Sequence, residues 1–333
     1  MKTSYLYYFL LIFVLLFGCN SRNSTVERQD KLSLTIANIV ASNCDKLHTS
    51  KLSYEVAFLS QIIDKLGHID SNFSTFLEDN VDAYVKDDGT IIFSDSINTF
   101  YPTINLITLY KRTGDDKYKR AIEKYISEIE NNLKKGKETF KGYDAFCMSN
   151  IFLVQYAKEF NKHQWFSYVT NRMIKVYSKE KNELLIEYFD DIQESDDINN
   201  NIIIGKYLVS VVDVLEFLPK NHSNYKELIS ILNTSFEIES SKYKKDGIWT
   251  MGQKKDIDLE TSLMISYSFA KSANNRYLPE SYINEANKIF DSIKEEFELL
   301  EEEETYKLEE GICKDDSPFN LALLLMTAIE LDK

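Results

Sequence analysis

The chain has 333 residues, with 53 acidic against 39 basic side chains and a formal net charge of −14 at pH 7. This length supplies one large domain or two ordinary ones, and the acidic excess argues against a general nucleic-acid binder, which would present a basic face. With only 4 prolines and 10 glycines, the composition also argues against extended disorder and an all-β sandwich. It predicts a helical protein with a soluble body.

The first segment has the pattern of a bacterial lipoprotein signal. An apolar run over residues 5–17 is too short for a comfortable membrane span, and it ends in the lipobox-like Leu16-Phe17-Gly18-Cys19. We therefore expect residues 1–18 to be a signal peptide, Cys19 to carry lipid, and residues 19–49 to form a polar tether. The chain would then touch the membrane of the cell envelope only through its lipid anchor. The alternative is an ordinary secretory signal with an unrelated cysteine.

From about residue 50 the sequence predicts amphipathic helices separated by short polar turns. Apolar residues recur at three- and four-residue spacing in residues 56–66, 104–110, 118–133, 151–160, 166–177, 207–218, 228–243, 263–272, 282–297 and 319–331. Glycines and prolines such as Gly67, Pro219 and Pro318 mark helix boundaries. No shift in composition divides residues 50–333, which predicts one domain.

Short β-like pieces interrupt this helical pattern. Two of them open on Asp88-Gly89 and Asp246-Gly247, and residues 184–189 have the same character without a glycine. Successive helical hairpins with such loops favour an all-α toroid whose loops at one rim form the mouth of a central cavity. An open superhelix of helical repeats is the competing layout, although no regular repeat period is found.

Several kinds of chemistry lack their sequence signals. The chain has no glycine-rich nucleotide loop, no Gly-x-Ser-x-Gly elbow and no His-Glu-x-x-His, and its four histidines are not at ligand spacing. Cys44, Cys147 and Cys313 are odd in number and fit neither a metal site nor a disulfide framework; Cys147 lies in an apolar run, where a cysteine is usually buried. We therefore expect no metal and no cofactor, which leaves carboxylates for proton transfer.

Asp144 is the principal candidate among the acids. It comes directly before an apolar helix and follows Tyr143, so it could deliver a proton, but helix N-capping is an equally simple role. Glu187 and Glu260 occupy comparable loop positions, and Glu260 could serve simply as a first-turn acid beside capping hydroxyls. Trp249 could stack on a sugar ring, although core packing is the commoner role of a tryptophan.

An ordered set of segments resembles glycoside hydrolase families 88 and 105, the unsaturated glucuronyl and rhamnogalacturonyl hydrolases. The set comprises Thr-Gly-Asp-Asp-Lys-Tyr at 113–118, Asp-Ala-Phe-Cys-Met at 144–148, Val-Asp-Val-Leu-Glu-Phe-Leu-Pro at 212–219, Asp-Gly-Ile-Trp at 246–249 and Leu-Glu-Thr-Ser at 259–262. The resemblance extends from about residue 50 to the end. It implies an (α/α)6 barrel of six helical hairpins.

The resemblance also implies a substrate and a proton donor. The substrate would be an oligosaccharide, left by a polysaccharide lyase, that ends in a 4,5-unsaturated uronic acid. An aspartate protonates the enol ether, water adds at C5, and the hemiketal opens to release the next sugar. That aspartate maps onto Asp144, with Tyr143, Lys206, Trp249, Glu260 and Glu187 around the substrate.

The chain departs from the family pattern at several pocket positions. Where the families carry an arginine and a tryptophan that help to hold the uronate, this chain has Ile202 and Lys206, and an expected histidine is Glu187. Lys206 could replace the arginine as a point charge but without its fork geometry. The alternative function is therefore an inactive barrel at the cell surface that binds a glycan or a protein partner.

Overall fold

Helices that are buried all round alternate along the chain with helices that are buried on one side. In the computed structural model, α12 (Leu259–Asn274) is buried without interruption from Thr261 to Ala273, as expected of a helix enclosed by other helices. By contrast, α7 (Asp116–Lys134) buries the stripe Tyr118, Ala121, Ile122, Ile126 and Ile129 and turns its charged side chains to solvent. The sequence thus distinguishes inner from outer helices.

The structure describes a single unit within Leu32–Lys333. The described residues are 32–43, 54–69, 71–92, 100–137, 140, 142–178, 183–184, 189, 200–242, 250–251, 256–294, 300–302, 305–307 and 318–333. None of the helices among them is long and apolar enough to cross a membrane.

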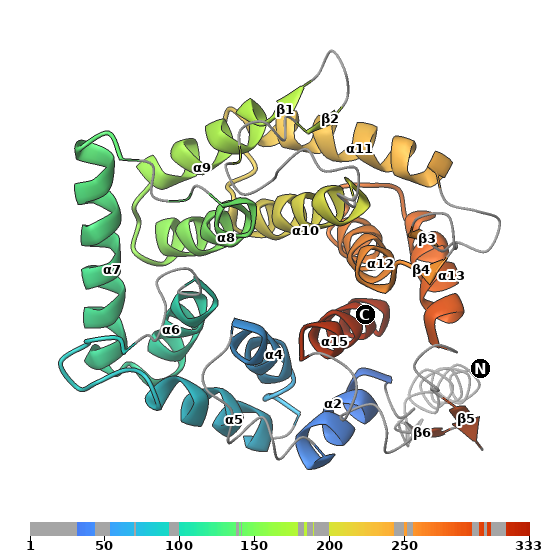
Figure 1. Ribbon diagram of the computed structural model, residues 1–333, viewed down its shortest axis with the longest axis horizontal. Coiled ribbons are helices and arrows are strands. Elements are labelled where there is room, and N and C mark those ends of the chain that lie inside the picture. The colour runs from blue at the N-terminus through green and yellow to red at the C-terminus, as the bar shows by residue number, and fades with distance from the viewer. Residues whose placement is uncertain are drawn as a thin grey trace, which may run out of the picture. The chain divides into compact units, whose positions relative to one another are not determined.

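Six inner helices form a closed ring (Figure 1). In chain order they are α4 (Tyr54–Asp64), α6 (Phe100–Thr113), α8 (Tyr143–Glu159), α10 (Asn200–Phe217), α12 and α15 (Pro318–Leu331). Each contacts the next, and α15 returns to contact α4. This closure confirms the (α/α)6 toroid and excludes the open superhelix for this part of the chain.

Six outer helices each pair with one inner helix (Figure 1). They are α2 (Leu32–Asn43), α5 (Ser71–Asp82), α7, α9 (Gln164–Lys175), α11 (Tyr225–Lys242) and α13 (Tyr282–Lys294). The first of them, α2, packs on the last inner helix, α15. The sequence pattern predicts neither α2 nor α5, but it predicts the other ten described helices.

The position of α2 shortens the predicted tether. The sequence analysis places residues 19–49 outside the folded domain, but Leu32–Asn43 is helical and belongs to the same unit as the ring. Ile36 and Ala37 are completely buried, and the Ser33 amide donates a hydrogen bond to Asp332 Oδ2 at 3.0 Å. The apolar residues of this segment therefore serve the core, and the domain begins before residue 50.

The inner helices run parallel, as the hydrogen bonds between them demonstrate. Near the helix starts, Asn105 Nδ2 on α6 donates to the carbonyl of Ala57 on α4 at 2.9 Å. Near the helix ends, Asn274 Nδ2 on α12 donates to the carbonyl of Glu330 on α15 at 2.8 Å. Inner and outer helices alternate along the chain as paired hairpins, so the inner helices start at one rim of the ring, called the starting rim below, and finish at the other, the finishing rim.

Connections of two kinds follow from this parallel arrangement. Inner helices lead to outer helices through tight turns at the finishing rim, such as residues 114–115 and 275–281. Outer helices lead to inner helices through longer segments at the starting rim, and these segments carry the β-structure. The described parts of these segments contain three antiparallel pairs: β1 (Tyr177–Ser178) with β2 (Glu183–Leu184), β3 (Thr250–Met251) with β4 (Asp256–Ile257), and β5 (Leu300–Glu302) with β6 (Thr305–Lys307).

A further β-bridge confirms the predicted turn at Asp88-Gly89. Val85 pairs with Ile91 in antiparallel fashion, and Gly89 takes a φ of 77°, which favours glycine. The hairpin is tied to α7, because Arg120 Nη2 donates to the carbonyl of Asp87 at 2.6 Å. The described parts of the long connections at the starting rim therefore contain hydrogen-bonded hairpins.

Candidate functional site

Asp144 is the second residue of α8 and does not cap the helix. The N-cap is Gly142, whose backbone is extended and which has no side chain to offer the helix amides. The Asp144 carboxylate instead accepts a hydrogen bond at Oδ1 from Lys206 Nζ at 2.8 Å. The capping role is therefore wrong, and Asp144 is joined to α10 by an ion pair.

Helix periodicity places Asp144 over the inside of the ring. A cavity of about 100 Å³ lies between the inner helices, and Met148, Ile151 and Gln155 line it from α8. Asp144 precedes Met148 by one turn on the same helix face. Its side chain is 65% exposed, so solvent reaches the carboxylate at the starting rim.

Lys206 holds the matching position on α10. Val209, Asp213 and Glu216 line the cavity from that helix, and Lys206 precedes them on the same face. The Lys206 side chain is only 19% exposed, because its stem is covered while its ammonium group reaches Asp144. The structure thus brings together two of the predicted site residues, at the start of two neighbouring inner helices.

Glu260 lies at the corresponding level of α12. Lys271 lines the cavity about three turns further along α12, so Glu260 and Lys271 share the inward face of that helix. Asp258 caps α12 and accepts hydrogen bonds from the Thr261 amide at 3.1 Å and from Thr261 Oγ1 at 2.8 Å. Since Asp258 fulfils the capping role, Glu260 is a half-buried acid of the first turn.

Tyr143 links two neighbouring inner helices. Its side chain is buried, it donates its hydroxyl hydrogen to the carbonyl of Ile203 on α10, and its ring meets Phe189 edge to face at 4.8 Å. Burial raises the pKa of the Tyr143 hydroxyl well above its usual value. Tyr143 therefore fixes α8 against α10, and its contact with a substrate stays a prediction.

Cys147 is a buried free thiol, as the sequence predicts. Burial raises the pKa of the Cys147 thiol to about 12, so almost no thiolate exists at neutral pH. Its backbone carbonyl accepts a hydrogen bond from Ser210 Oγ at 3.1 Å, a further link between α8 and α10. Cys147 therefore packs beside the site and supplies no nucleophile.

Four other predicted positions are not covered by the structure. Glu187, Trp249, Cys19 and the tether before Leu32 lie outside the described residues. Their assigned roles stay predictions.

The finishing-rim end of the cavity holds a buried network that the sequence analysis does not predict. Lys271 Nζ lies 2.6 Å from both Asp213 Oδ1 and Glu216 Oε2, and it donates to Tyr267 Oη at 2.9 Å. Burial alone would lower the pKa of Lys271, but Asp213, Tyr267 and Glu216 outweigh burial and raise that pKa well above the usual value. A charged residue in an otherwise apolar helix is the sequence signal that could have revealed this network.

Lys65 lies near the same network. Lys65 borders the cavity and keeps exposed surface. Burial, followed by repulsion from Lys271, lowers the pKa of Lys65. Apolar side chains, among them Ile62, Ile104 and Met326, line the same cavity.

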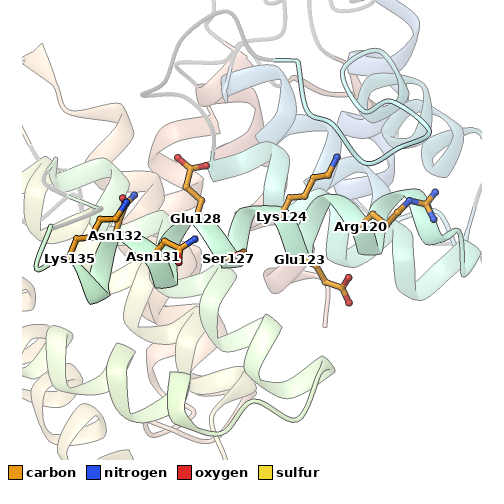
Figure 2. A pocket seen from close by; sticks show the side chains of 8 residues that line it. All are labelled: Arg120, Glu123, Lys124, Ser127, Glu128, Asn131, Asn132 and Lys135. Carbon is orange, nitrogen blue, oxygen red and sulfur yellow. The ribbon is translucent and has the colours of Figure 1, made fainter.

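A larger hollow of about 690 Å³ lies on α7, away from the ring interior (Figure 2). All of its described lining residues come from α7 and its C-cap: Arg120, Glu123, Lys124, Ser127, Glu128, Asn131, Asn132 and Lys135. Charged side chains of both signs and no apolar side chain line it, whereas ligand pockets are mostly apolar. The hollow also contains none of the predicted site residues, so the starting rim of the ring, where Asp144 and Lys206 lie, is the better candidate. In the residues that the structure describes, no cluster of histidine, cysteine or acidic side chains could hold a metal ion.

Comparison with known proteins supports the fold and shows the family. The family model described as Glycosyl Hydrolase Family 88 matches residues 68–320. A family 105 glycoside hydrolase from C. acetobutylicum superposes with a TM-score of 0.75 at 22% identity, covering 90% of this chain and 99% of the other. A family 88 glycosyl hydrolase from Bacteroides vulgatus gives 0.67 at 15%, covering 90% and 98%. A possible family 105 member from Salmonella enterica gives 0.69 at 14%, covering 91% and 94%.

Proposed function

Because the chain belongs to glycosyl hydrolase family 88, a family of glycosidase-type enzymes, we propose that it acts on terminal 4,5-unsaturated uronic acids. The substrates would be oligosaccharides left by polysaccharide lyases. The enzyme would hydrate the enol ether of the terminal residue and so release the adjacent sugar.

One observation carries this proposal: a solvent-accessible acid lies at the starting rim, one helical turn from a residue that lines the ring cavity. Asp144 is 65% exposed and lies one turn beyond the cavity-lining Met148. A proton donor must come within hydrogen-bond reach of the atom that it protonates, and a sugar entering at the starting rim would meet Asp144 first. The reaction needs one acid, unlike the paired carboxylates of ordinary glycosidases.

The proposed reaction consumes one water molecule. Asp144 gives its proton to C4, where the electron pair of the C4=C5 bond forms the new C–H bond. Water then forms a bond to C5 and returns a proton to the Asp144 carboxylate. The resulting hemiketal opens to a C5 ketone, and the hemiacetal left at C1 then breaks its bond to the leaving sugar.

The test is turnover of unsaturated disaccharides by the purified domain. The absorbance of the enol ether in the ultraviolet should disappear, and Asp144→Asn should slow its loss by about 10²–10⁴-fold. Asp116→Asn is a matched control, because Asp116 is an exposed first-turn acid of the outer helix α7 and should leave the rate unchanged. An Asp144→Asn variant as active as the parent would show that another group donates the proton.

A panel of substrates separates the two candidate functions. No turnover of pectic, ulvan-type and glycosaminoglycan disaccharides would contradict the proposal. Binding of these sugars without turnover would indicate the alternative, an inactive barrel that holds a glycan.

We also propose that Cys19 anchors the protein in the cell envelope through a lipid. The support is the lipobox-like end of the apolar run before it. Fractionation of cells that express the full chain tests this: the protein should sediment with membranes, and Cys19→Ala should release it. Equal sedimentation of both forms would contradict lipidation.

A further inference from the structure

The ammonium group of Lys206 makes fewer hydrogen bonds within the described part of the protein than it has donors. An ammonium carries three N–H donors. Within the described part of the chain, Lys206 gives one hydrogen bond, to Asp144 Oδ1 at 2.8 Å. Two donors therefore have no described partner, at a point where the neighbouring carboxylate is open to solvent.

The lysines at the two ends of the cavity are not equivalent. Lys271 is held between Asp213 and Glu216 at 2.6 Å from each, and its side chain is 4% exposed. Lys65 borders the same finishing-rim end. Of the lysines described along the inward faces of the inner helices, Lys206 is the one at the starting rim, where a sugar would enter.

We propose that Lys206 binds the carboxylate of the substrate uronate and exchanges Asp144 for it as a hydrogen-bond partner. This inference rests on the proposed function. The uronate carboxylate and Asp144 are the same kind of acceptor, so they compete for one cation. Two carboxylates beside a single ammonium leave an excess negative charge, which is relieved when one of them takes up a proton. Asp144 thus gains from solvent the proton that it delivers to C4.

The apolar lining next to the pair strengthens this exchange. Met148 and Val209 each lie one turn inward from Asp144 and Lys206 and border the cavity. A sugar ring over these side chains displaces water from the ion pair, and attraction between charges grows as water is removed. Asp144 recovers a proton from the attacking water. When the product leaves, Asp144 gives this proton back to solvent and pairs with Lys206 again.

The experiment combines a change in the enzyme with a change in the substrate. The unsaturated disaccharide is supplied as the free acid and as its methyl ester, which keeps the enol ether but removes the negative charge. Wild type should prefer the acid. Lys206→Met should lower the ratio of kcat/KM for acid over ester by about 10–100-fold, and Lys206→Arg should retain most of it, since both cations bind carboxylates. Lys220→Met, an exposed lysine just beyond the other end of α10, should keep the wild-type ratio.

The outcomes distinguish this inference from the proposed function. If Lys206→Met loses acid and ester activity equally, or neither, Lys206 does not bind the carboxylate and the inference fails while the function stands. If wild type turns over neither substrate, the proposed function fails, and binding of saturated glucuronate then decides the inference by calorimetry. Weaker binding to Lys206→Met than to wild type supports it, and equal or absent binding overturns it. A thermal melt of each variant checks that it is folded.

Discussion

The two ends of the ring cavity hold similar charged groups in opposite surroundings. At the starting rim, Lys206 meets a single carboxylate that is 65% exposed. At the finishing rim, Lys271 is buried between two carboxylates and a tyrosine hydroxyl. The long connections lie at the first end and the tight turns at the second.

This difference separates the part of the barrel that holds its shape from the part that is available to a ligand. A buried charge needs all of its partners, so the Lys271 network fixes α10 against α12. An exposed ion pair gains little from its geometry and can exchange its partner at small cost. The same barrel can therefore keep one end rigid while the other end changes its chemistry.

The largest expected difference in stability is between variants that lack the lysine at one end of the cavity or at the other. Lys271→Met should lower the free energy of unfolding by about 3–5 kcal/mol, because Asp213 and Glu216 lose their common partner. Lys206→Met should cost less than about 1 kcal/mol, because water can solvate the exposed Asp144 carboxylate. Urea unfolding of the two variants measures both values. Equal losses would remove the distinction between the two ends.

An intermediate effect on stability should appear at two glycines, one at each rim. Here the substitution at the starting rim should cost more than the one at the finishing rim. Gly89 (φ 77°) lies in the hairpin at the starting rim, and a Cβ there would stand 2.7 Å from the Ala121 backbone nitrogen on α7. Gly114 (φ 70°) lies in the turn between α6 and α7, where a Cβ would meet no atom within 4 Å. Gly89→Ala should cost about 2–3 kcal/mol, since overpacking adds to backbone strain, and Gly114→Ala about 1 kcal/mol. Thermal melts that rank them the other way would show that the hairpin is loosely packed.

The smallest expected effect is on the loss of stability at acidic pH. Burial alone would raise the pKa of Glu216, but Lys271 and then Lys65 outweigh it, so this pKa lies below its ordinary value of 4.5. A carboxyl group of this kind stabilises the fold above its unfolded pKa, and the contribution is lost as pH falls from about 4.5 through the folded pKa. Glu216→Gln should therefore flatten the fall in stability below pH 5, by less than about 1 kcal/mol because the side chain is 45% exposed.

Chemical denaturation at several pH values measures this slope. Glu280→Gln, at an exposed acid in the turn between α12 and α13, serves as the control and should keep the slope of the parent. A slope that Glu216→Gln leaves unaltered would mean that the Lys271 network does not sense the ionisation of Glu216.

Sequence periodicity predicts helices well where one face is continuously apolar. The pattern predicts residues 118–133, and the structure has α7 from Asp116 to Lys134. In α5 the buried residues Phe73, Phe76, Leu77 and Val81 also have helical spacing, but frequent polar residues obscure the pattern. The helical spacing of these four residues is nevertheless visible in the sequence. α2 directly follows a polar segment, so it is easily assigned to the tether.

The site was only partly accessible to sequence reasoning. Asp144 and Lys206 could be proposed from motifs, but their ion pair depends on α8 and α10 being neighbours with the same direction. The Lys271 network needs the same knowledge for α10 and α12. Spacing along one helix indicates which residues share a face, whereas ring closure decides which faces meet.

The ring closes through contacts between its first and last described inner helices, α4 and α15. The outer helix α2 also packs on α15, and its Ser33 is hydrogen-bonded to a residue 299 positions away. A ribosome therefore releases α15 only after the other described helices have been made. Until then, the apolar flanks of α2 and α4 lack their partner, and these surfaces are open to aggregation. Completion of the barrel therefore waits for α15, the last described helix, and the nascent chain has to be protected until that helix arrives.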